Sequence, residues 1–366
     1  MHILFYFPTN QRSVALETWM EEFSHRGLKV WLSGRGEKRD IHDTVETHGV
    51  KTETHSPPTG LHLSLTYLWC IVQLRKFIRN HNTDLIYSHT QPVNFVSVFT
   101  QFLVRARFII CRRHSDYIMK CNNANAKRFD RIINKPGKEF IVPSKKVFHQ
   151  ITEIEGVDPA KVRRINYACD FEAYPKPDEN RDPEIQKYDP AQLRLCTVSR
   201  FIPCKRYDIL IDCVGQLAGS GFDLCLPILG NGPLEEKLKA QVHDLGLEQH
   251  IHFIGFTTEV INSMAASDMI VHFFDSEGSN SVIKEAGLIK KLVAICQDVG
   301  DFDEDIEPDR NGFVQSKDRS RPDFTKVVEK VYARSADYKA MGEALRAHVM
   351  KHFSFGHVIY EYNKVL

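Results

Sequence analysis

Short apolar runs alternate with longer amphipathic segments along most of the chain. The first run, HILFYF, is followed by a polar stretch and then by a segment whose apolar positions between Val14 and Phe23 recur at helical spacing until Gly27. The later runs LKVWLS, DLIYS, ARFIIC and EFIVPS are rich in β-branched and aromatic residues. This alternation predicts βαβ units around a parallel sheet.

The pattern is interrupted between Phe171 and Gln192, where four prolines and many charges occur without periodicity. We interpret residues 171–192 as a linker that follows a first domain, residues 1–170. The cycle then restarts with LRLCTVS, DLCLPILG, HIHFIG, MIVHFF and KLVAIC, and the helix after DLCLPILG is expected to open at Pro233. The sequence thus predicts a second doubly wound domain over residues 193–352, with ligands bound in a crevice at the carboxyl ends of the strands. The apolar segment 353–366 is expected to pack back on the first domain.

Composition is that of a soluble globular protein of two domains: 366 residues, 42% hydrophobic and 26% charged. The net charge of +1 hides an asymmetry, because residues 1–170 carry 25 Lys and Arg against 16 Asp and Glu, whereas the remainder is acidic. A basic first half is expected to face nucleic acid, a membrane surface or a phosphorylated substrate, unless the charges simply cluster on solvated faces.

Nine scattered cysteines without a C-x-x-C pair argue against a disulfide framework and against a zinc site, so we expect a cytoplasmic protein. The amino-terminal run MHILFYFP has no basic region before it and no cleavage site after it, which argues against a signal peptide. The most apolar long stretch, residues 61–74, is too short and too polar to cross a membrane.

Two cations and two glycines follow strands of the second domain. Arg200 and Lys205 come directly after LRLCTVS, where they would neutralise a diphosphate; the alternative is a pair of solvated loop cations. Gly230 and Gly232 flank a tight turn in ILGNGPLEEKL, a pattern of low specificity because such turns need glycine for backbone reasons.

The stretch EGSNSVIKEA places small capping residues, Ser279, Asn280 and Ser281, before a helix. The amino end of a helix binds anions through its free N–H groups. Glu277 precedes this anion site. Glu285 comes eight residues after Glu277, which on helical geometry corresponds to an offset of about 80° between the two side chains. Carboxylates would repel a phosphate and therefore suit hydroxyl groups, so the combination predicts a sugar nucleotide.

With these motifs in view, residues 198–315 resemble the retaining glycosyltransferases of the GT-B fold, family 4. The matching pieces are SRFIPCK, ILGNGPLEEKL, the LGL...HIHFIGF run and the E-x7-E pair, with weaker matches at QDVG and NGFV. In the first domain, FIVPSKKV, EGVDPAKVRRI and the C-D-F at 169–171 fit the same family. The resemblance implies two Rossmann-like domains facing each other across a cleft.

The resemblance also implies roles for individual residues. Arg200 and Lys205 would hold the donor diphosphate, Glu285 the ribose hydroxyls, and Glu277 the hydroxyls of the transferred sugar. His114, which alone would pass for an ordinary loop residue, would face the donor sugar, and Asn10, Gln11 and Arg12 would line the acceptor side. The remaining donor-binding positions would be Gly230, Gly232, Phe256, Thr257, Gly278, Ser279, Asn280, Ser281 and Val282, with Phe256 and Thr257 near the base.

The implied reaction is metal-independent transfer with retention of configuration and requires no cofactor. Its main demand is to stabilise negative charge on the departing diphosphate. The chain departs from the family at Asn10 and Gln11, where glycines are common, at Lys290–Leu292 in place of Gly-x-Pro, and at Asp301 in place of a second glycine. The departure at Asn10 and Gln11 leaves the shape of the acceptor site undetermined, the one at Lys290–Leu292 changes only a turn, and the one at Asp301 narrows the choice of donor.

We expect transfer from a UDP-sugar to a glycan or a lipid-linked saccharide, in surface polysaccharide or lipopolysaccharide synthesis, with peripheral contact between the basic first domain and the anionic inner membrane face. The alternatives are a sugar-nucleotide epimerase or hydrolase, a phosphorylase, and a non-enzymatic nucleotide-sugar or anionic-surface binding protein. A metal-dependent transferase would use the D-x-D pattern of Asp301, Asp303 and Asp305, which reads better as an acidic loop. Nucleic acid is not expected as a partner, because no binding motif accompanies the basic runs.

Overall fold

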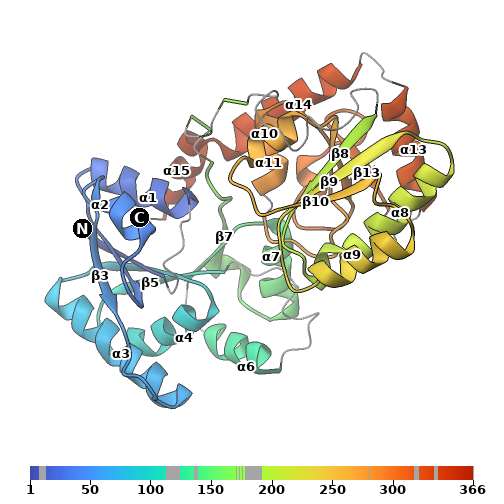
Figure 1. Ribbon diagram of the computed structural model, residues 1–366. Helices are drawn as coiled ribbons and strands as arrows, with labels where there is room; N and C mark the ends of the chain where they lie inside the picture. The colour runs from blue at the N-terminus through green and yellow to red at the C-terminus, as the bar shows by residue number, and fades with distance from the viewer. Residues whose placement is uncertain are drawn as a thin grey trace. The chain divides into compact units, whose positions relative to one another are not determined.

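The computed structural model describes residues 1–7, 14–112, 124–135, 139–169, 171–172, 174, 176–177, 192–279, 281–316, 321–333 and 337–365. The chain divides into two compact units. The first consists of Met1–Asp170 together with Phe355–Leu366, and the second is Phe171–Ser354. Figure 1 shows the elements of both units.

The first unit contains a seven-stranded parallel sheet in the order β3-β2-β1-β4-β5-β6-β7. The strands are β1 (His2–Tyr6), β2 (Lys29–Arg35), β3 (Lys51–His55), β4 (Leu85–His89), β5 (Arg107–Cys111), β6 (Glu139–Val142) and β7 (Val162–Arg164). The helices are α1 (Val14–His25), α2 (Asp40–Glu46), α3 (Leu63–Asn80), α4 (Gln91–Thr100), η1 (Gln101–Leu103), α6 (Ala124–Ile133), α7 (Lys145–His149), η2 (Gln150–Ile154), η3 (Pro159–Lys161) and α15 (Phe355–Asn363).

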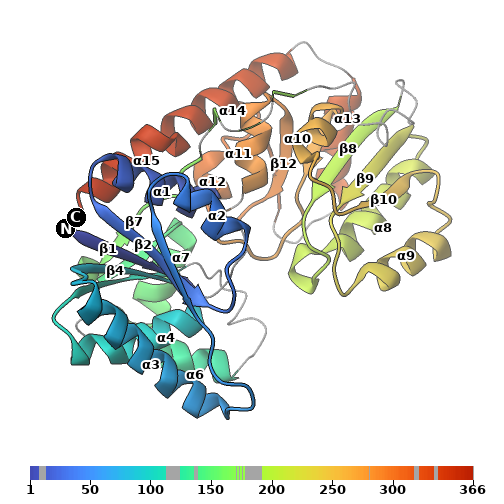
Figure 2. The same cartoon turned by 60° about the vertical axis from the view of Figure 1, so that its left-hand side comes forward.

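Both faces of the inner part of this sheet are covered, which explains why β1, β4, β5 and β6 are mostly apolar and buried. Along β1, Ile3 and Phe5 point into a core shared with α1 and α15, whereas Leu4 and Tyr6 point into a core shared with α3 and α4. Figures 1 and 2 show α3, α4 and α6 together on one side of the sheet. The alternation of side chains along β1 therefore builds two cores on opposite faces.

The carboxy-terminal helix α15 completes the first unit. The ring of Tyr362 lies 3.9 Å, centroid to centroid, from that of Trp19 on α1. Arg107 donates a hydrogen bond from Nη1 to the carbonyl of Val365 at 2.7 Å. Val358, Ile359, Tyr362 and Val365 thus pack in the same core as the first strand.

The second unit contains a six-stranded parallel sheet in the order β10-β9-β8-β11-β12-β13. The strands are β8 (Leu193–Val198), β9 (Leu224–Leu229), β10 (Ile251–Gly255), β11 (Met269–Val271), β12 (Leu292–Cys296) and β13 (Phe313–Gln315). The helices are η4 (Pro203–Lys205), α8 (Tyr207–Gly219), α9 (Glu235–Asp244), α10 (Val260–Ala265), α11 (Ser281–Leu288), α12 (Phe302–Asp305), α13 (Arg321–Tyr332) and α14 (Asp337–Phe353).

Strand order reverses between β8 and β11, which is the topological switch point of this sheet and the usual ligand position in open α/β folds. The prediction of two doubly wound parallel sheets is confirmed. One helix start differs from the prediction, because α9 begins at Glu235 rather than Pro233. The N–H of Leu234 donates instead to the carbonyl of Phe201, which holds residues 233–234 in a turn. Within the described ranges, no helix combines the length and the apolar character that a membrane span requires.

Candidate functional site

An ion pair joins the two loops at the switch point of the second sheet. Lys205, in the loop after β8, donates from Nζ to Oε2 of Glu277, in the loop after β11, at 2.6 Å. The side chains are only 12% and 21% exposed, so the pair is sheltered from water. Lys205 Nζ also lies 3.7 Å from the centroid of the Phe274 ring. Two predicted site residues are therefore in direct contact.

The backbone and a second ion pair hold these loops together. The N–H of Asp275 donates to the carbonyl of Cys204 at 2.8 Å. Arg206 reaches the carboxylates of Asp275 at 3.4 Å and of Asp208 at 3.1 Å. The position of Lys205 against Glu277 is thus fixed by the surrounding chain rather than by the pair alone.

Arg200 differs from Lys205 in its surroundings. Its side chain is exposed and forms no ion pair with any residue that the structure describes. The loop after β8 therefore presents two ion-paired cations, Lys205 and Arg206, and one exposed cation, Arg200, that can meet an anion.

The glycines after β9 allow the loop after β8 to pack closely. A Cβ at Gly230, whose φ is +129°, would overlap the carbonyl oxygen of Ser199, and a Cβ at Gly232 would lie 2.7 Å from the backbone nitrogen of Phe201. The N–H of Phe201 donates to the carbonyl of Asn231 at 2.9 Å. This packing accounts for both glycines through backbone contacts within the chain.

Helix α11 starts at Ser281 and carries the second glutamate. Before it, Gly278 is buried, and its N–H donates to Oε1 of Glu277 at 3.0 Å. Ser279 accepts a hydrogen bond at Oγ from Nζ of Lys284, at 2.8 Å. Lys284 is 3% exposed. The amino end of α11 thus adjoins the ion-paired glutamate and is supported from within by a buried lysine, while Val282 packs in the core.

Glu285 is half-buried on α11 and accepts a hydrogen bond at Oε1 from the hydroxyl of Tyr174, at 3.4 Å. Burial raises the pKa of the Glu285 carboxyl, although the Tyr174 hydroxyl and the charge of Lys284 act in the opposite direction. Tyr174 lies in the segment interpreted as linker, where nothing in the sequence pattern pointed to a contact with α11. Lys284 was likewise not predicted from the sequence as part of the site.

A buried histidine lies behind the ion pair. His272 follows β11 and is fully buried, and its two ring nitrogens have no hydrogen-bond partner among the described residues. Burial, and to a smaller extent the charge of Lys205, lowers the pKa of His272 to about 3. His272 is the one polar residue in the apolar run MIVHFF, and nothing else in the sequence indicated that it lies next to the site.

The loop after β10 lies at the same edge of the sheet. Phe256 is 76% exposed. Thr257 accepts a hydrogen bond at Oγ1 from the N–H of Glu259 at 3.0 Å, which shapes the turn. Within the described residues, neither Phe256 nor Thr257 forms a hydrogen bond with Lys205 or Glu277. An aromatic ring this exposed is suited to stacking against a flat ligand.

Five predicted residues lie outside the described residues: Asn10, Gln11, Arg12, His114 and Asn280. Next to one of these segments, Arg112 at the end of β5 is buried and pairs with Asp130 at 3.4 Å and with Glu155 at 3.1 Å. This buried network ties β5 to the helical layer of the first unit.

In the acidic run after β12, residues 301–305, Asp303 and Asp305 contact neighbouring residues of the second unit. Asp303 accepts hydrogen bonds from the N–H of Asp298, and Asp305 pairs with His348 at 3.1 Å. Among the described residues, one group of side chains could together hold a metal ion: Glu21, His25 and His48 of the first unit have ligand atoms within 4.8 Å of one another. None of the predicted site residues belongs to this group.

Two family models match consecutive parts of the chain. Glycosyltransferase Family 4 matches residues 13–172, and Glycosyl transferases group 1 matches residues 178–348. Solved structures of Anabaena HepE in complex with UDP and with UDP-glucose have the same fold, with TM-scores of 0.83 and 0.82, 20% identity and complete coverage of both chains.

Two curated relatives match over shorter stretches. A poly(ribitol-phosphate) alpha-N-acetylglucosaminyltransferase of Staphylococcus aureus is 26% identical over 32% of this chain and 24% of that protein. An N-acetylgalactosamine-N,N'-diacetylbacillosaminyl-diphospho-undecaprenol 4-alpha-N-acetylgalactosaminyltransferase of Campylobacter jejuni is 25% identical over 62% of this chain and 61% of that protein. The chain therefore spans less than two thirds of either relative's length in these matches.

The family models, the two parallel sheets and the solved structures agree with the resemblance found in the sequence. The chain belongs to the glycosyltransferases of the GT-B fold, with a Glycosyltransferase Family 4 region followed by a Glycosyl transferases group 1 region.

Proposed function

We propose that the protein transfers a sugar from a UDP-sugar to a glycan or a lipid-linked saccharide, with retention of configuration and without a metal. The observation that carries the proposal is the Lys205–Glu277 contact at the switch point, next to the amino end of α11. This arrangement has a cation, the amino end of a helix and a carboxylate in one small region, which supports the binding of a phosphate next to hydroxyl groups.

In the proposed complex, the donor diphosphate binds Arg200, Lys205 and the backbone around Ser279–Val282. Arg200 is exposed and free to form a bidentate contact, whereas Lys205 is already oriented by Glu277 and Phe274. A phosphate that approaches Lys205 shares this cation with Glu277. The sharing holds the carboxylate beside the sugar attached to the phosphate.

The two glutamates bind hydroxyl groups in this proposal. Glu277 accepts from the transferred sugar, and Glu285 accepts from the ribose, with Tyr174 as the donor that orients it. Phe256 offers its exposed ring to the base. In the first unit, His114 faces the donor sugar and Asn10–Arg12 line the acceptor side, as the family resemblance implies.

The proposed chemistry breaks the bond between the anomeric carbon and the diphosphate oxygen and forms one from that carbon to the acceptor oxygen. The acceptor proton passes to an oxygen of the departing diphosphate, so no carboxylate attacks carbon. Arg200, Lys205 and the α11 dipole stabilise the negative charge that grows on the leaving group. Retention preserves the anomeric configuration, and both curated relatives are named as alpha-transferases.

The donor and acceptor classes in this proposal are supported by the proteins that the chain resembles. HepE was solved with UDP and with UDP-glucose, and the name of the Campylobacter relative contains a lipid diphosphate acceptor. A lipid-linked acceptor fits a cytoplasmic enzyme that works at the inner membrane face in surface glycan synthesis. Contact between the basic first half and anionic lipid would bring enzyme and acceptor together.

The test is thermal stabilisation by UDP, GDP, ADP and NAD in parallel. A ligand at 100 times its dissociation constant adds about 2.7 kcal/mol to the stability of the folded state. We expect a shift with UDP that is lost in Lys205→Ala and kept in Lys239→Ala, which removes an exposed lysine paired with Glu235. A protein that no diphosphate stabilises at saturation would contradict the proposal.

A second candidate, a sugar-nucleotide epimerase or hydrolase, uses the same donor site. It would convert or cleave the UDP-sugar at the same rate with and without acceptor. Release of UDP that depends on added acceptor excludes this candidate.

A further inference from the structure

Helix α3 presents an apolar stripe to solvent on the face opposite its packed side. Cys70, Leu74 and Phe77 are buried against the sheet. On the outer face, Leu65, Leu68 and Val72 follow one another at spacings of three and four residues and are 52%, 57% and 41% exposed. A helix that packs on only one side normally exposes polar residues on the other. The sequence of α3 is therefore apolar on a face that its own fold leaves uncovered.

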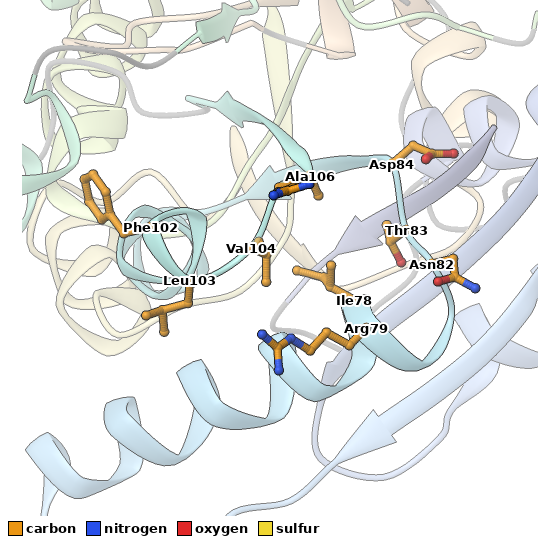
Figure 3. Close-up of a pocket in the computed structure, with 10 residues that line it drawn as sticks. Ile78, Arg79, Asn82, Thr83, Asp84, Phe102, Leu103, Val104 and Ala106 are labelled. Atoms are coloured by element: carbon orange, nitrogen blue, oxygen red, sulfur yellow. The ribbon is translucent and has the colours of Figure 1, made fainter.

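The end of helix α4 continues this exposed surface. Phe99 on α4 and Phe102 and Leu103 on η1 are 40%, 74% and 47% exposed. Leu103 and Arg79 line the same cavity of about 650 Å³, between the end of α3 and residues 102–106 (Figure 3). Seven of the thirteen exposed large apolar side chains in the described ranges lie within residues 63–103, so the clustering is not a general property of this surface.

Cationic side chains border the apolar residues. Arg75, Lys76 and Arg79 lie in the last two turns of α3, and this helix contains no acidic residue. Arg105 lines the cavity beside Arg79. None of these four side chains forms an ion pair or a hydrogen bond with a described residue. We call the outer face of α3 from Leu65 to Arg79, with residues 99–105, the α3 surface.

We infer that the α3 surface binds a bilayer that contains anionic lipid. The apolar half of the stripe would enter the boundary between headgroups and acyl chains, and the basic half would meet lipid phosphates. The long Lys and Arg side chains can keep their charges at headgroup level while their stems lie on apolar surface. The inference rests on the peripheral membrane contact proposed above and assigns it to particular residues.

The charges favour a bilayer over a second copy of the chain. A second copy of the chain would bring the same apolar residues and cations to this face, but no acidic residue of α3 to pair with Arg75, Lys76 and Arg79. The cations of two copies would repel each other, and the one carboxylate lining the adjoining cavity, Asp84, already accepts a hydrogen bond from the N–H of His2. An anionic lipid surface removes the repulsion and covers the leucines at the same time.

The experiment is co-sedimentation of the full chain with phosphatidylcholine vesicles, with and without 30 mol% phosphatidylglycerol, as roughly the anionic content of a charged leaflet. We expect binding only to the anionic vesicles. Lys76→Gln/Arg79→Gln should bind about 25-fold more weakly, because each cation near such a surface contributes roughly fivefold. Leu65→Ser/Leu68→Ser should lose roughly tenfold or more. Lys237→Gln/Lys339→Gln changes net charge equally at exposed positions of the second unit and should bind like the wild type.

Each other outcome overturns the inference. If the wild type does not co-sediment with anionic vesicles, the bilayer is ruled out as the occupant. If all three variants lose vesicle binding equally, the α3 surface is ruled out as the binding site. A wild-type dimer that Leu65→Ser/Leu68→Ser converts to monomers identifies a second copy as the occupant. UDP-induced stabilisation of every variant is measured in parallel. This shift should be unchanged, so failure at the membrane is distinguished from failure of the donor site.

Discussion

Lys205 and Glu277 are 72 residues apart in sequence, yet their side chains meet at 2.6 Å where the loops after β8 and β11 adjoin. A cation proposed to bind diphosphate is therefore held by a carboxylate proposed to bind the sugar. Both groups are largely shielded from solvent, which strengthens their attraction and raises the cost of removing either partner. The pair links phosphate recognition to sugar recognition.

Lys205→Ala should reduce kcat/KM for the UDP-sugar about 10- to 100-fold, because a hydrogen bond to a charged group is worth about 1.5–3 kcal/mol. The variant also leaves Glu277 without its cation, so its repulsion of the diphosphate adds to the loss. Steady-state kinetics with varied donor measure the effect. Lys239→Ala is the control, and an equal loss in both variants would argue that Lys205 does not contact the donor.

Glu285→Gln should increase stability while weakening donor binding. Burial raises the pKa of Glu285 above its usual 4.5, so the folded state retains a proton that the unfolded chain releases. The contribution of Glu285 to stability is therefore greatest below pH 4.5 and is lost as pH rises through its folded pKa. Urea unfolding should show Glu285→Gln to be more stable at pH 7, with the difference shrinking toward pH 4.

Glu285→Gln should therefore gain stability and lose affinity for UDP, and both urea unfolding and UDP binding are measured on this variant. A glutamine donates as well as accepts, so it replaces the carboxylate poorly opposite ribose hydroxyls. Weaker UDP binding together with unchanged stability would mean that the carboxylate is not strained by burial. Unchanged UDP binding would remove Glu285 from the donor site.

His272→Leu should make the protein more resistant to acid. Between pH 6.5 and about 3, the unfolded chain binds a proton at His272 that the folded chain does not. This residue therefore lowers stability by up to about 1.4 kcal/mol for each pH unit as pH falls through that window. Unfolding at pH 7, 6 and 5 should give a shallower decline in His272→Leu. His243→Leu is the control, because Glu248 raises the pKa of His243 at an exposed position; equal slopes in the variant and the wild type would contradict the assignment.

The fold could be predicted from the sequence because ten of the thirteen strands in the described residues lie in apolar runs that can be recognised without knowledge of their partners. The edge strands β3, β7 and β13 are polar or only three residues long and gave no such signal. Lys205 was found because it follows a buried strand, at the edge of the sheet where ligands bind, and Glu277 and Glu285 were found through the capping residues and helical spacing of EGSNSVIKEA. Their contacts could not be predicted in this way. Lys205 meets Glu277 only because β8 and β11 are neighbours in the sheet.

Other features had no periodic signal to reveal them. Tyr174 lies among the prolines after the first unit, and its contact with Glu285 depends on where that irregular chain runs. Leu65, Leu68 and Val72 have the spacing of core residues, so the exposed stripe on α3 became visible only when the opposite face proved to be the packed one. A hydrophobic pattern identifies a face but not what covers it.

Gly230→Ala should disrupt the donor-side loops. An added Cβ would overlap the carbonyl oxygen of Ser199, and the φ of +129° disfavours any side chain. We expect a loss of about 2–4 kcal/mol in the stability of the second unit. Gly219→Ala, at the end of α8 with no atom within 4 Å of the new methyl group, should be neutral or stabilising. Similar unfolding midpoints for the two variants would show that the β8 loop can move aside freely.

Tyr362→Ala should destabilise the first unit from the far end of the chain. Tyr362 is 1% exposed, and its ring packs on Trp19 in the core beneath β1. Deleting a buried aromatic side chain costs about 3–5 kcal/mol, because the cavity adds to the lost burial. Tyr360→Ala, two residues earlier on α15, removes a ring that is 61% exposed and should cost little. Hydrogen exchange should show the loss in the strands of the first unit, and equal exchange in the two variants would mean that α15 does not stabilise that core.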